Sequence, residues 1–186
     1  MKNLILLTGL FVFFSCKNEG TTTAKDELTE ITESVANATK EGNGKVILNC
    51  NGKQISADGI CGGITTMGTL TIAVKDNINP AKVFTIDFST DHYPENGKEY
   101  IVKPKDYTSD KKPENEVSVS FMEGLPNNKM NVWDAQSASG KLKFTVNGNE
   151  IKCIFNDIKL QPSTIYNAED LQKEGIVSGE LTLYKN

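Results

Sequence analysis

The sequence predicts an all-β fold, a single antiparallel β-sandwich or barrel of about nine or ten strands. From residue 45 to residue 186, apolar and polar residues alternate with a period of two over a series of short segments. Turn-forming residues separate these segments, and Asn51-Gly52 and Asn147-Gly148 are the strongest hairpin signals among them. No segment in this region shows the helical period of a crossover between parallel strands. We therefore expect an antiparallel sheet.

Residues 1–15 indicate an export signal ahead of this domain. Lys2 precedes an apolar segment, residues 4–14, which ends at Ser15 and Cys16. A helix that spans a bilayer needs roughly 20 apolar residues, so this segment is too short to be one. Two alternatives stay open here, a signal peptide without an attached lipid and a buried element of the fold.

The end of this segment predicts a lipid anchor. Phe13-Phe14-Ser15-Cys16 resembles the lipobox of bacterial lipoproteins, in which a small residue precedes the cysteine that is acylated. The resemblance implies that residues 1–15 are removed and that acylated Cys16 holds the protein on the lipid bilayer. It further implies a place in the bacterial cell envelope, on the outer membrane, facing the periplasm or the cell surface.

Residues 16–44 are expected to form a lipidated tether, partly helical or disordered. Thr21-Thr22-Thr23 near its start and Glu41-Gly42-Asn43-Gly44 at its end are flexible sequences. Between them a narrow apolar stripe recurs at helical spacing, formed by Leu28, Ile31, Val35 and Ala38. Because the stripe is narrow, any helix here would pack weakly.

The strands of the domain, residues 45–186, follow from the alternation. The apolar residues that share one face are, in chain order, Val46, Leu48 and Cys50; Leu70, Ile72 and Val74; Phe84, Ile86 and Phe88; Val117, Val119 and Phe121; Leu142, Phe144 and Val146; and Ile151, Cys153 and Phe155. Further strands are expected at 53–58, 99–103, 130–132 and 176–184. A short helix capped by Asn167 is expected at 167–173.

Charge and composition exclude several kinds of partner. The net charge is −4, and every basic residue is a lysine. Nucleic acids bind clustered Lys and Arg, and bidentate recognition of phosphate depends on arginine. We therefore expect no nucleic-acid partner. Because the chain has no motif for a phosphate-binding loop, a dinucleotide or a serine nucleophile, we also expect no cofactor.

The cysteines allow at most one disulfide within the chain. If Cys16 is acylated, Cys50, Cys61 and Cys153 remain, an odd number. A hairpin at Asn51-Gly52 would carry the chain away from Cys50, so we expect no bridge between Cys50 and Cys61. Cys153 is the expected partner, of Cys61 or of Cys50. Three buried thiols without a bridge remain an alternative.

The candidate ligand-binding residues are aromatic: Trp133, Tyr93 and Tyr107, with Tyr166 as a further one. Trp133 alternates with Met130 and Val132, so it is expected on the opposite face from these two. An outward tryptophan could stack on a sugar ring or a peptide. It could equally cover an edge of the core beneath a loop.

Catalytic or metal-binding chemistry has few candidates. His92 is the only histidine, and with Asp91 and Glu95 we expect it to form an exposed turn, without a metal or a general base. A hydrolase could use two carboxyl groups held across a cleft. The polar loop residues that could supply them are Asp106, Asp110, Glu114 and Glu116. We expect a solvated loop instead.

Several strand and turn sequences carry a further resemblance. They are Asn51-Gly52-Lys53, Gly68-Thr69-Leu70-Thr71-Ile72, Gly140-Lys141-Leu142-Lys143-Phe144, the Asn147-Gly148 hairpin, and Val177-Ser178-Gly179-Glu180-Leu181-Thr182-Leu183. Together they resemble a family of uncharacterised β-rich lipoproteins of the Bacteroidota, known as a domain of unknown function. The resemblance covers most of residues 45–186 and brings no catalytic residues with it.

The expected function is that of a membrane-anchored envelope lipoprotein. Its β domain would bind a small ligand, a glycan or a protein partner and would catalyse no reaction, an expectation that rests on analogy at the level of the fold. One alternative is a structural or assembly role, as an accessory subunit of an outer-membrane complex. A second alternative is a hydrolase that uses the loop carboxylates.

Overall fold

Ten strands in one sheet make up the structure, a computed structural model that describes residues 42–76, 78, 82–105, 113–167 and 173–185. The strands are β1 (Gly42–Cys50), β2 (Lys53–Thr66), β3 (Thr69–Asp76), β4 (Lys82–Phe88), β5 (Glu99–Val102), β6 (Glu116–Leu125), β7 (Lys129–Ala135), β8 (Gly140–Asn147), β9 (Glu150–Asn167) and β10 (Gly175–Tyr184). A single 3₁₀ turn among the described residues, η1 (Pro126–Asn128), joins β6 to β7. The all-β prediction is confirmed.

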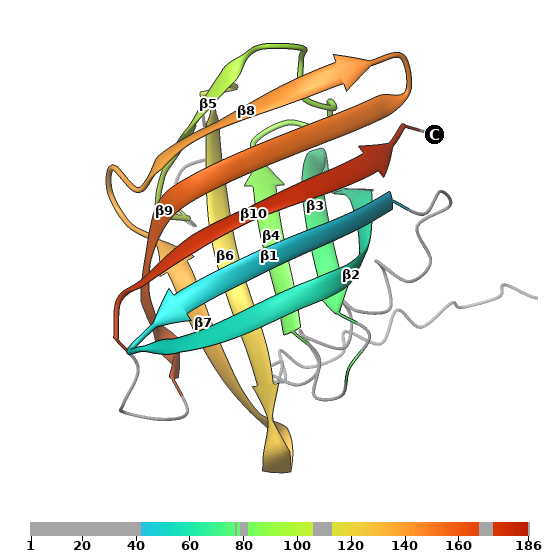
Figure 1. Cartoon of the computed structure of the whole chain (residues 1–186). Coiled ribbons are helices and arrows are strands. Elements are labelled where there is room, and N and C mark those ends of the chain that lie inside the picture. Colours follow the sequence, from blue (N-terminus) through green and yellow to red (C-terminus); the bar gives the residue numbers. More distant parts are fainter. Residues whose placement is uncertain (1–41, 77, 79–81, 106–112, 168–172, 186) are drawn as a thin grey trace, which may run out of the picture.

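The strand pairings form a closed, barrel-like circuit (Figure 1). From β1 it passes through β2, β3, β4, β6, β7 and β9, and β10 pairs with both β9 and β1. β5 and β8 extend the sheet between the start of β6 and the start of β9. Closure leaves few backbone groups unpaired at a sheet edge, which is how a β protein avoids pairing with other chains.

One pairing departs from the antiparallel pattern. β5 runs parallel to β6, with Ile101 opposite Glu116 and Val102 opposite Val117. Parallel neighbours need a connection of roughly a dozen residues or more. The segment 103–115 between these two strands is long enough to make that return.

The first predicted hairpin is confirmed together with its register. Cys50 lies opposite Lys53. Asn51 and Gly52 have φ values of 52° and 72°, and a positive φ at both central residues is what a type I′ turn requires. The predicted separation of Cys50 from Cys61 follows, because Cys61 pairs with Gly42 at the far end of β1.

β2 is longer than predicted. It continues past residue 58 to Thr66, and the chain then turns at Met67 and Gly68, whose φ values are 50° and 78°. Methionine seldom adopts a positive φ, so Gly68 was the only signal for this turn in the sequence.

β1 begins at Gly42, so residues 42–44, expected to end the tether, belong to the sheet. Gly44 packs closely between its neighbours. A Cβ at this position would lie 2.5 Å from Cγ2 of Val74 and 3.3 Å from Cβ of Leu181. Gly44 is therefore a packing residue of the core.

Two predicted helices and the lipid site fall wholly or partly outside the described residues. Cys16 and the stripe at 28–38 are among them, as are residues 168–172 of the helix expected at 167–173. Asn167, the expected cap of that helix, is the last residue of β9.

The interior is filled by one face of each strand. The six sets of alternating apolar residues predicted to point inward all belong to the core or, for Val146, pack against it. Aromatic rings meet at its centre: Phe84 stacks on Phe155 with ring centroids 5.2 Å apart, and Phe144 contacts Phe88 and Tyr100 at 5.7 and 5.6 Å.

The predicted faces of β7 are reversed. Trp133 and Ala135 point into the main core, whereas Met130 and Val132 belong to a second apolar cluster on the other face of the sheet. β7 carries apolar residues on both faces, and a strand of that kind gives no internal sign of which face is the core.

Candidate functional site

A polar strip crosses the outer face of the sheet, on the side away from the main core. Thr85 of β4, Ser120 of β6 and Asp134 of β7 lie next to one another in register. At the next outward-facing position, Thr71 of β3 lies opposite Asp87 of β4. These five residues bring two carboxylates and three hydroxyl groups onto one surface.

The second apolar cluster borders this polar strip. Its buried members are Ala73, Val83, Met122, Met130 and Val132, each at most 5% exposed. The partly buried ring of Tyr166 packs against them. A polar and an apolar surface therefore meet along the outer faces of β4, β6 and β7.

An insertion in β9 rises beside this boundary. Asn131 of β7 pairs with Asn167, but Trp133 pairs with Pro162. Residues 163–166 of β9 therefore oppose Val132 alone. We call residues 163–166 the β9 insertion.

The buried side chain of Ser163 shapes this insertion. Its hydroxyl oxygen accepts the backbone N–H groups of Ile165 at 3.3 Å and of Tyr166 at 3.4 Å. A serine that bonds the backbone two and three residues ahead stabilises a turn. The turn places Tyr166 against the second apolar cluster.

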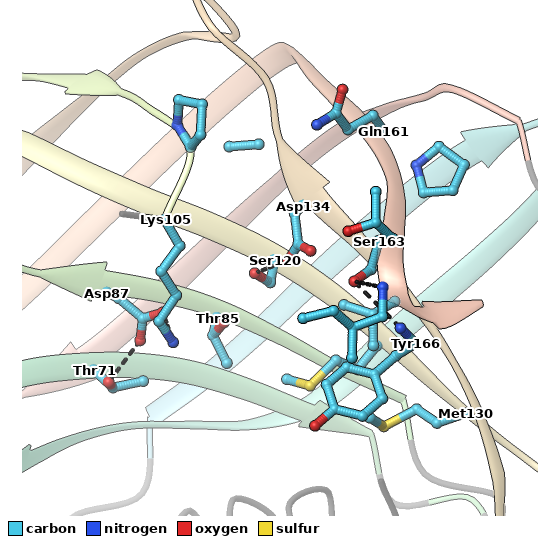
Figure 2. A pocket seen from close by; sticks show the side chains of 17 residues that line it. Thr71, Thr85, Asp87, Lys105, Ser120, Met130, Asp134, Gln161, Ser163 and Tyr166 are labelled. Atoms are coloured by element: carbon cyan, nitrogen blue, oxygen red, sulfur yellow. Dashed lines mark hydrogen bonds and ion pairs between the residues drawn. The ribbon is translucent and has the colours of Figure 1, made fainter. Parts of the chain in front are cut away.

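The β9 insertion, the polar strip and residues 104–105 enclose a pocket of about 380 Å³, which we call the β9 pocket. Figure 2 shows Asp87, Thr71 and Lys105 on one side of it and Ser163, Tyr166 and Met130 on the other. Ser120 and Asp134 lie between these two groups. The volume is in the range of small-molecule sites.

The two carboxylates of the pocket have different partners. Asp87 accepts a hydrogen bond of 2.7 Å from the Thr71 hydroxyl and forms an ion pair of 3.3 Å with Nζ of Lys105. Asp134 accepts a hydrogen bond of 2.7 Å from the Ser120 hydroxyl. An ionised carboxylate has room for further donors after one such bond.

A second hollow, of about 330 Å³, lies beside the loop that follows β4. Its lining includes the predicted residues Tyr93, His92, Glu95 and Glu114. His92 itself is 85% exposed, with Nδ1 2.9 Å from a carboxylate oxygen of Asp91. The prediction of an exposed turn at His92 is thus confirmed.

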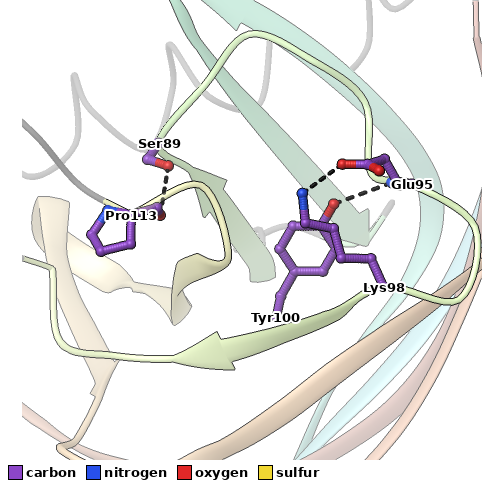
Figure 3. Close-up of polar contacts among 5 residues, drawn as sticks. All are labelled: Ser89, Glu95, Lys98, Tyr100 and Pro113. Carbon is purple, nitrogen blue, oxygen red and sulfur yellow. Dashed lines mark hydrogen bonds and ion pairs between the residues drawn. The ribbon is translucent and has the colours of Figure 1, made fainter.

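Internal contacts hold this loop in place (Figure 3). The Ser89 hydroxyl donates to the carbonyl oxygen of Pro113 at 3.1 Å, and the N–H of Glu95 donates to the phenol oxygen of Tyr100 at 3.1 Å. Lys98 pairs with the carboxylate of Glu95, and this hydrogen bond raises the pKa of Lys98. The polar groups of the loop are largely used to hold the loop itself.

Trp133 does not offer a surface to a ligand. It is 3% exposed and lies in the main core, where its Nε1–H donates to the carbonyl oxygen of Lys173 at 3.1 Å. The prediction of an outward, ligand-stacking Trp133 is wrong, because the face of β7 opposite Met130 is the inner one. The alternative prediction, that Trp133 covers an edge of the core beneath a loop, agrees with the observed position.

The other predicted ligand-binding aromatics are divided between three places. Tyr93 lies in the hollow beside the β4 loop, partly buried against the core. Tyr166 lines the β9 pocket. Tyr107 lies outside the described residues, as do two of the loop carboxylates, Asp106 and Asp110.

The candidate disulfide between Cys61 and Cys153 is not formed in the structure, where both are buried free thiols. In the sheet, β1 and β10 lie between their strands, β2 and β9. Burial raises the pKa of Cys61 to about 12, and Cys153 nearby adds to the effect; burial likewise raises the pKa of Cys153 to about 12. Cys50 is also free, and its thiol donates to the Lys173 carbonyl at 3.0 Å.

Apart from Tyr166, the residues that define the β9 pocket were not candidates in the sequence. Asp87, Ser120 and Asp134 each occupy the outward position of an alternating strand, where a polar residue is the ordinary choice. The unusual signal was the apolar content of both faces around Met130–Ala135, which marks a second covered surface.

Within the described ranges, no three or more His, Cys, Asp or Glu side chains are grouped so as to hold a metal ion. The same residues contain no helix with the length and apolarity needed to cross a bilayer. No protein-family model, curated protein or solved structure matches the chain.

Proposed function

We propose that this chain is a lipid-anchored envelope protein whose β domain binds a small, hydroxyl-rich ligand of the sugar class in the β9 pocket. The observation that carries the proposal is the meeting of the polar strip with the apolar wall of Met130, Val132 and Tyr166. Sugars have the same two-sided character, since hydroxyl groups ring a carbon skeleton whose faces are apolar.

The polar strip suits hydroxyl groups in particular. The carboxylate of Asp134 accepts hydrogen bonds, the Thr85 hydroxyl can donate and accept, and the Ser120 hydroxyl, which donates its proton to Asp134, can accept. A ring hydroxyl, itself both donor and acceptor, can satisfy either kind of group. The hydrogen bond that Ser120 donates to Asp134 holds the carboxylate in place before a ligand arrives.

The apolar wall would receive the face of the sugar ring. Tyr166 supplies an aromatic surface, and the methionines Met122 and Met130 adapt their shape to what they contact. The β9 insertion, held by Ser163, places Tyr166 against the methionines of this wall.

The proposal places the domain on the outer membrane through acylated Cys16, a residue outside the described ranges. Mass spectrometry of the protein purified from membranes tests this part. An acylated peptide that begins at Cys16 is the expected result, and an unmodified peptide that spans residues 15 and 16 would contradict it. The accessory-subunit and hydrolase alternatives remain predictions.

Isothermal titration calorimetry with a panel of mono- and disaccharides tests ligand binding. We expect at least one sugar to bind, and Tyr166→Ala to weaken that binding about tenfold through the loss of ring contact. Tyr184→Ala, which truncates a tyrosine exposed on β10, is the matched control. Binding that is unchanged in Tyr166→Ala would place the site elsewhere, and a panel without any bound sugar would refute the proposal.

A further inference from the structure

The charges around the β9 pocket are not balanced. The described residues of its lining include two carboxylates, Asp87 and Asp134, and one ammonium group, that of Lys105. Lys105 pairs with Asp87, with Nζ 3.3 Å from Oδ2. Within the part of the chain that the structure describes, Asp134 has no lysine or histidine within ion-pair distance. Among the described residues of the pocket, Asp134 is therefore a carboxylate without a counter-charge.

This carboxylate is at the middle of the pocket. Asp134 is flanked in register by Ser120 on one side and by Gln161 on the other. The Ser120 hydroxyl uses one acceptor position, on Oδ1, at 2.7 Å. A carboxylate has about four acceptor positions, so Asp134 can take a strong donor from a ligand. Figure 2 shows Asp134 between the Asp87 side and the Tyr166 side of the pocket.

The apolar side of the same pocket includes an aromatic ring, which is compatible with a cation. The face of an aromatic ring attracts a positive charge, and Tyr166 and Met130 form the apolar side of the pocket. The partial enclosure keeps some water out, which strengthens the attraction between opposite charges. A donor that is itself charged makes a shorter and stronger hydrogen bond with a carboxylate than a hydroxyl does.

We infer that the ligand of the β9 pocket carries a primary ammonium group that pairs with Asp134, while its carbon skeleton lies against Tyr166. With the sugar class of the proposed function, on which this inference rests, the expected ligand is an amino sugar. Lys105 disfavours the same pairing at Asp87, because its own ammonium group already occupies that carboxylate.

Calorimetry on the full-length lipoprotein in detergent tests the inference with four probes. They are glucosamine, N-acetylglucosamine, glucose and 1,4-diaminobutane, each measured at a pH where the free amines are protonated. We expect glucosamine to bind about ten times more tightly than N-acetylglucosamine or glucose, in keeping with a charge-assisted hydrogen bond. We expect the preference to shrink as salt is added.

Two variants test whether Asp134 is the carboxylate that pairs with the ammonium group of the ligand. Asp134→Asn keeps the shape of the side chain and should remove the preference for glucosamine over glucose. Asp58→Asn, which neutralises an exposed aspartate paired with Lys45 on the outer face of β2, should leave it unchanged. The circular dichroism spectrum and melting temperature of each variant show that it is folded.

The outcomes separate the inference from the proposed function. Equal affinity for glucose and glucosamine, or a preference that survives in Asp134→Asn, overturns the inference and leaves sugar binding intact. Equal affinity for 1,4-diaminobutane and glucosamine supports the ammonium pairing and overturns the sugar class. If none of the four probes binds, both are overturned.

Discussion

The hydroxyl oxygen of Ser163 accepts the backbone N–H of Tyr166 at a distance of 3.4 Å, within a four-residue insertion that faces a single residue of β7. This contact holds the wall of the β9 pocket. An insertion inside a strand loses ladder hydrogen bonds, so its shape depends on side chains that replace them. Ser163 supplies such a replacement from a buried position.

Ser163→Ala should therefore loosen the insertion. Two backbone donors lose their acceptor, and we expect the free energy of unfolding to fall by about 1 kcal/mol. Sugar affinity should fall as well, because Tyr166 is no longer held in place. Urea unfolding and calorimetry measure the two effects. Ser137→Ala, at an exposed turn, is the control, and equal stability of the two variants would show that Ser163 does not hold the insertion.

Gly179→Ala should destabilise the domain strongly. An added Cβ would lie 2.6 Å from the carbonyl oxygen of Lys45 and 2.9 Å from Cα of Val46, both backbone atoms of β1. Relief of this clash would require β1 and β10 to move apart. We expect a loss of about 1–3 kcal/mol, typical of overpacked sites, measured as a lower melting temperature.

A matched glycine tests whether this loss comes from close packing. Gly68 has a φ of 78° and open space around it, so Gly68→Asn, with a residue that tolerates positive φ, should be nearly neutral. A Gly179→Ala protein as stable as Gly68→Asn would contradict the pairing of β10 with β1.

The fluorescence of Trp133, the only tryptophan in the chain, tests whether this face of β7 points into the core. Its indole is 3% exposed among core side chains. We expect blue-shifted fluorescence that acrylamide quenches poorly, followed by a red shift and efficient quenching in denaturant. Efficient quenching in the folded protein would instead place Trp133 on the outer face.

The buried thiols predict a loss of stability at high pH. Burial raises the pKa of Cys61 and of Cys153 from 9.0 to about 12. Between these values the unfolded chain loses protons that the folded chain keeps, so the free energy of unfolding falls as pH rises from 9 towards 12. Each thiol contributes about 1.4 kcal/mol per pH unit in that window, as an order of magnitude.

The double variant Cys61→Ala, Cys153→Ala isolates this contribution from the titration of lysine and tyrosine. Its urea midpoint should change less between pH 8.5 and pH 10.5 than that of the wild type. Parallel pH curves for the two proteins would show that the thiols titrate normally. A thiol reagent at neutral pH should react with neither cysteine until the protein is unfolded.

The interior and the first hairpin were largely predictable from the sequence. The alternation in β1, β3, β4, β6, β8 and β9 identified the residues of the core, since a strand with one apolar face can bury only that face. Asn51-Gly52 located the first hairpin, because few residues accept the positive φ of a type I′ turn. Where both faces were apolar, as in β7, the same argument failed.

Alternation and turn signals predicted few residues of the candidate site. Asp87 and Asp134 are 47 positions apart in the chain, and only the order β4–β6–β7 brings them to one surface. Of the pocket residues, Tyr166 alone was a candidate in the sequence. Its partner Ser163 has no distinguishing feature in the sequence. Its role follows only from the register of β9 against β7, which contains the insertion.

The amino-acid order alone determined that this chain forms a β domain, which side chains share a face in most strands, and that the basic charge is carried by lysine only. The tertiary structure decided which strands are neighbours, which face of β7 is inside, and where a pocket forms. The physical reason is the range of the interactions. Alternation and turn propensity act over a few residues, whereas closure of the sheet and the register of β9 against β7 depend on packing between segments distant in the chain.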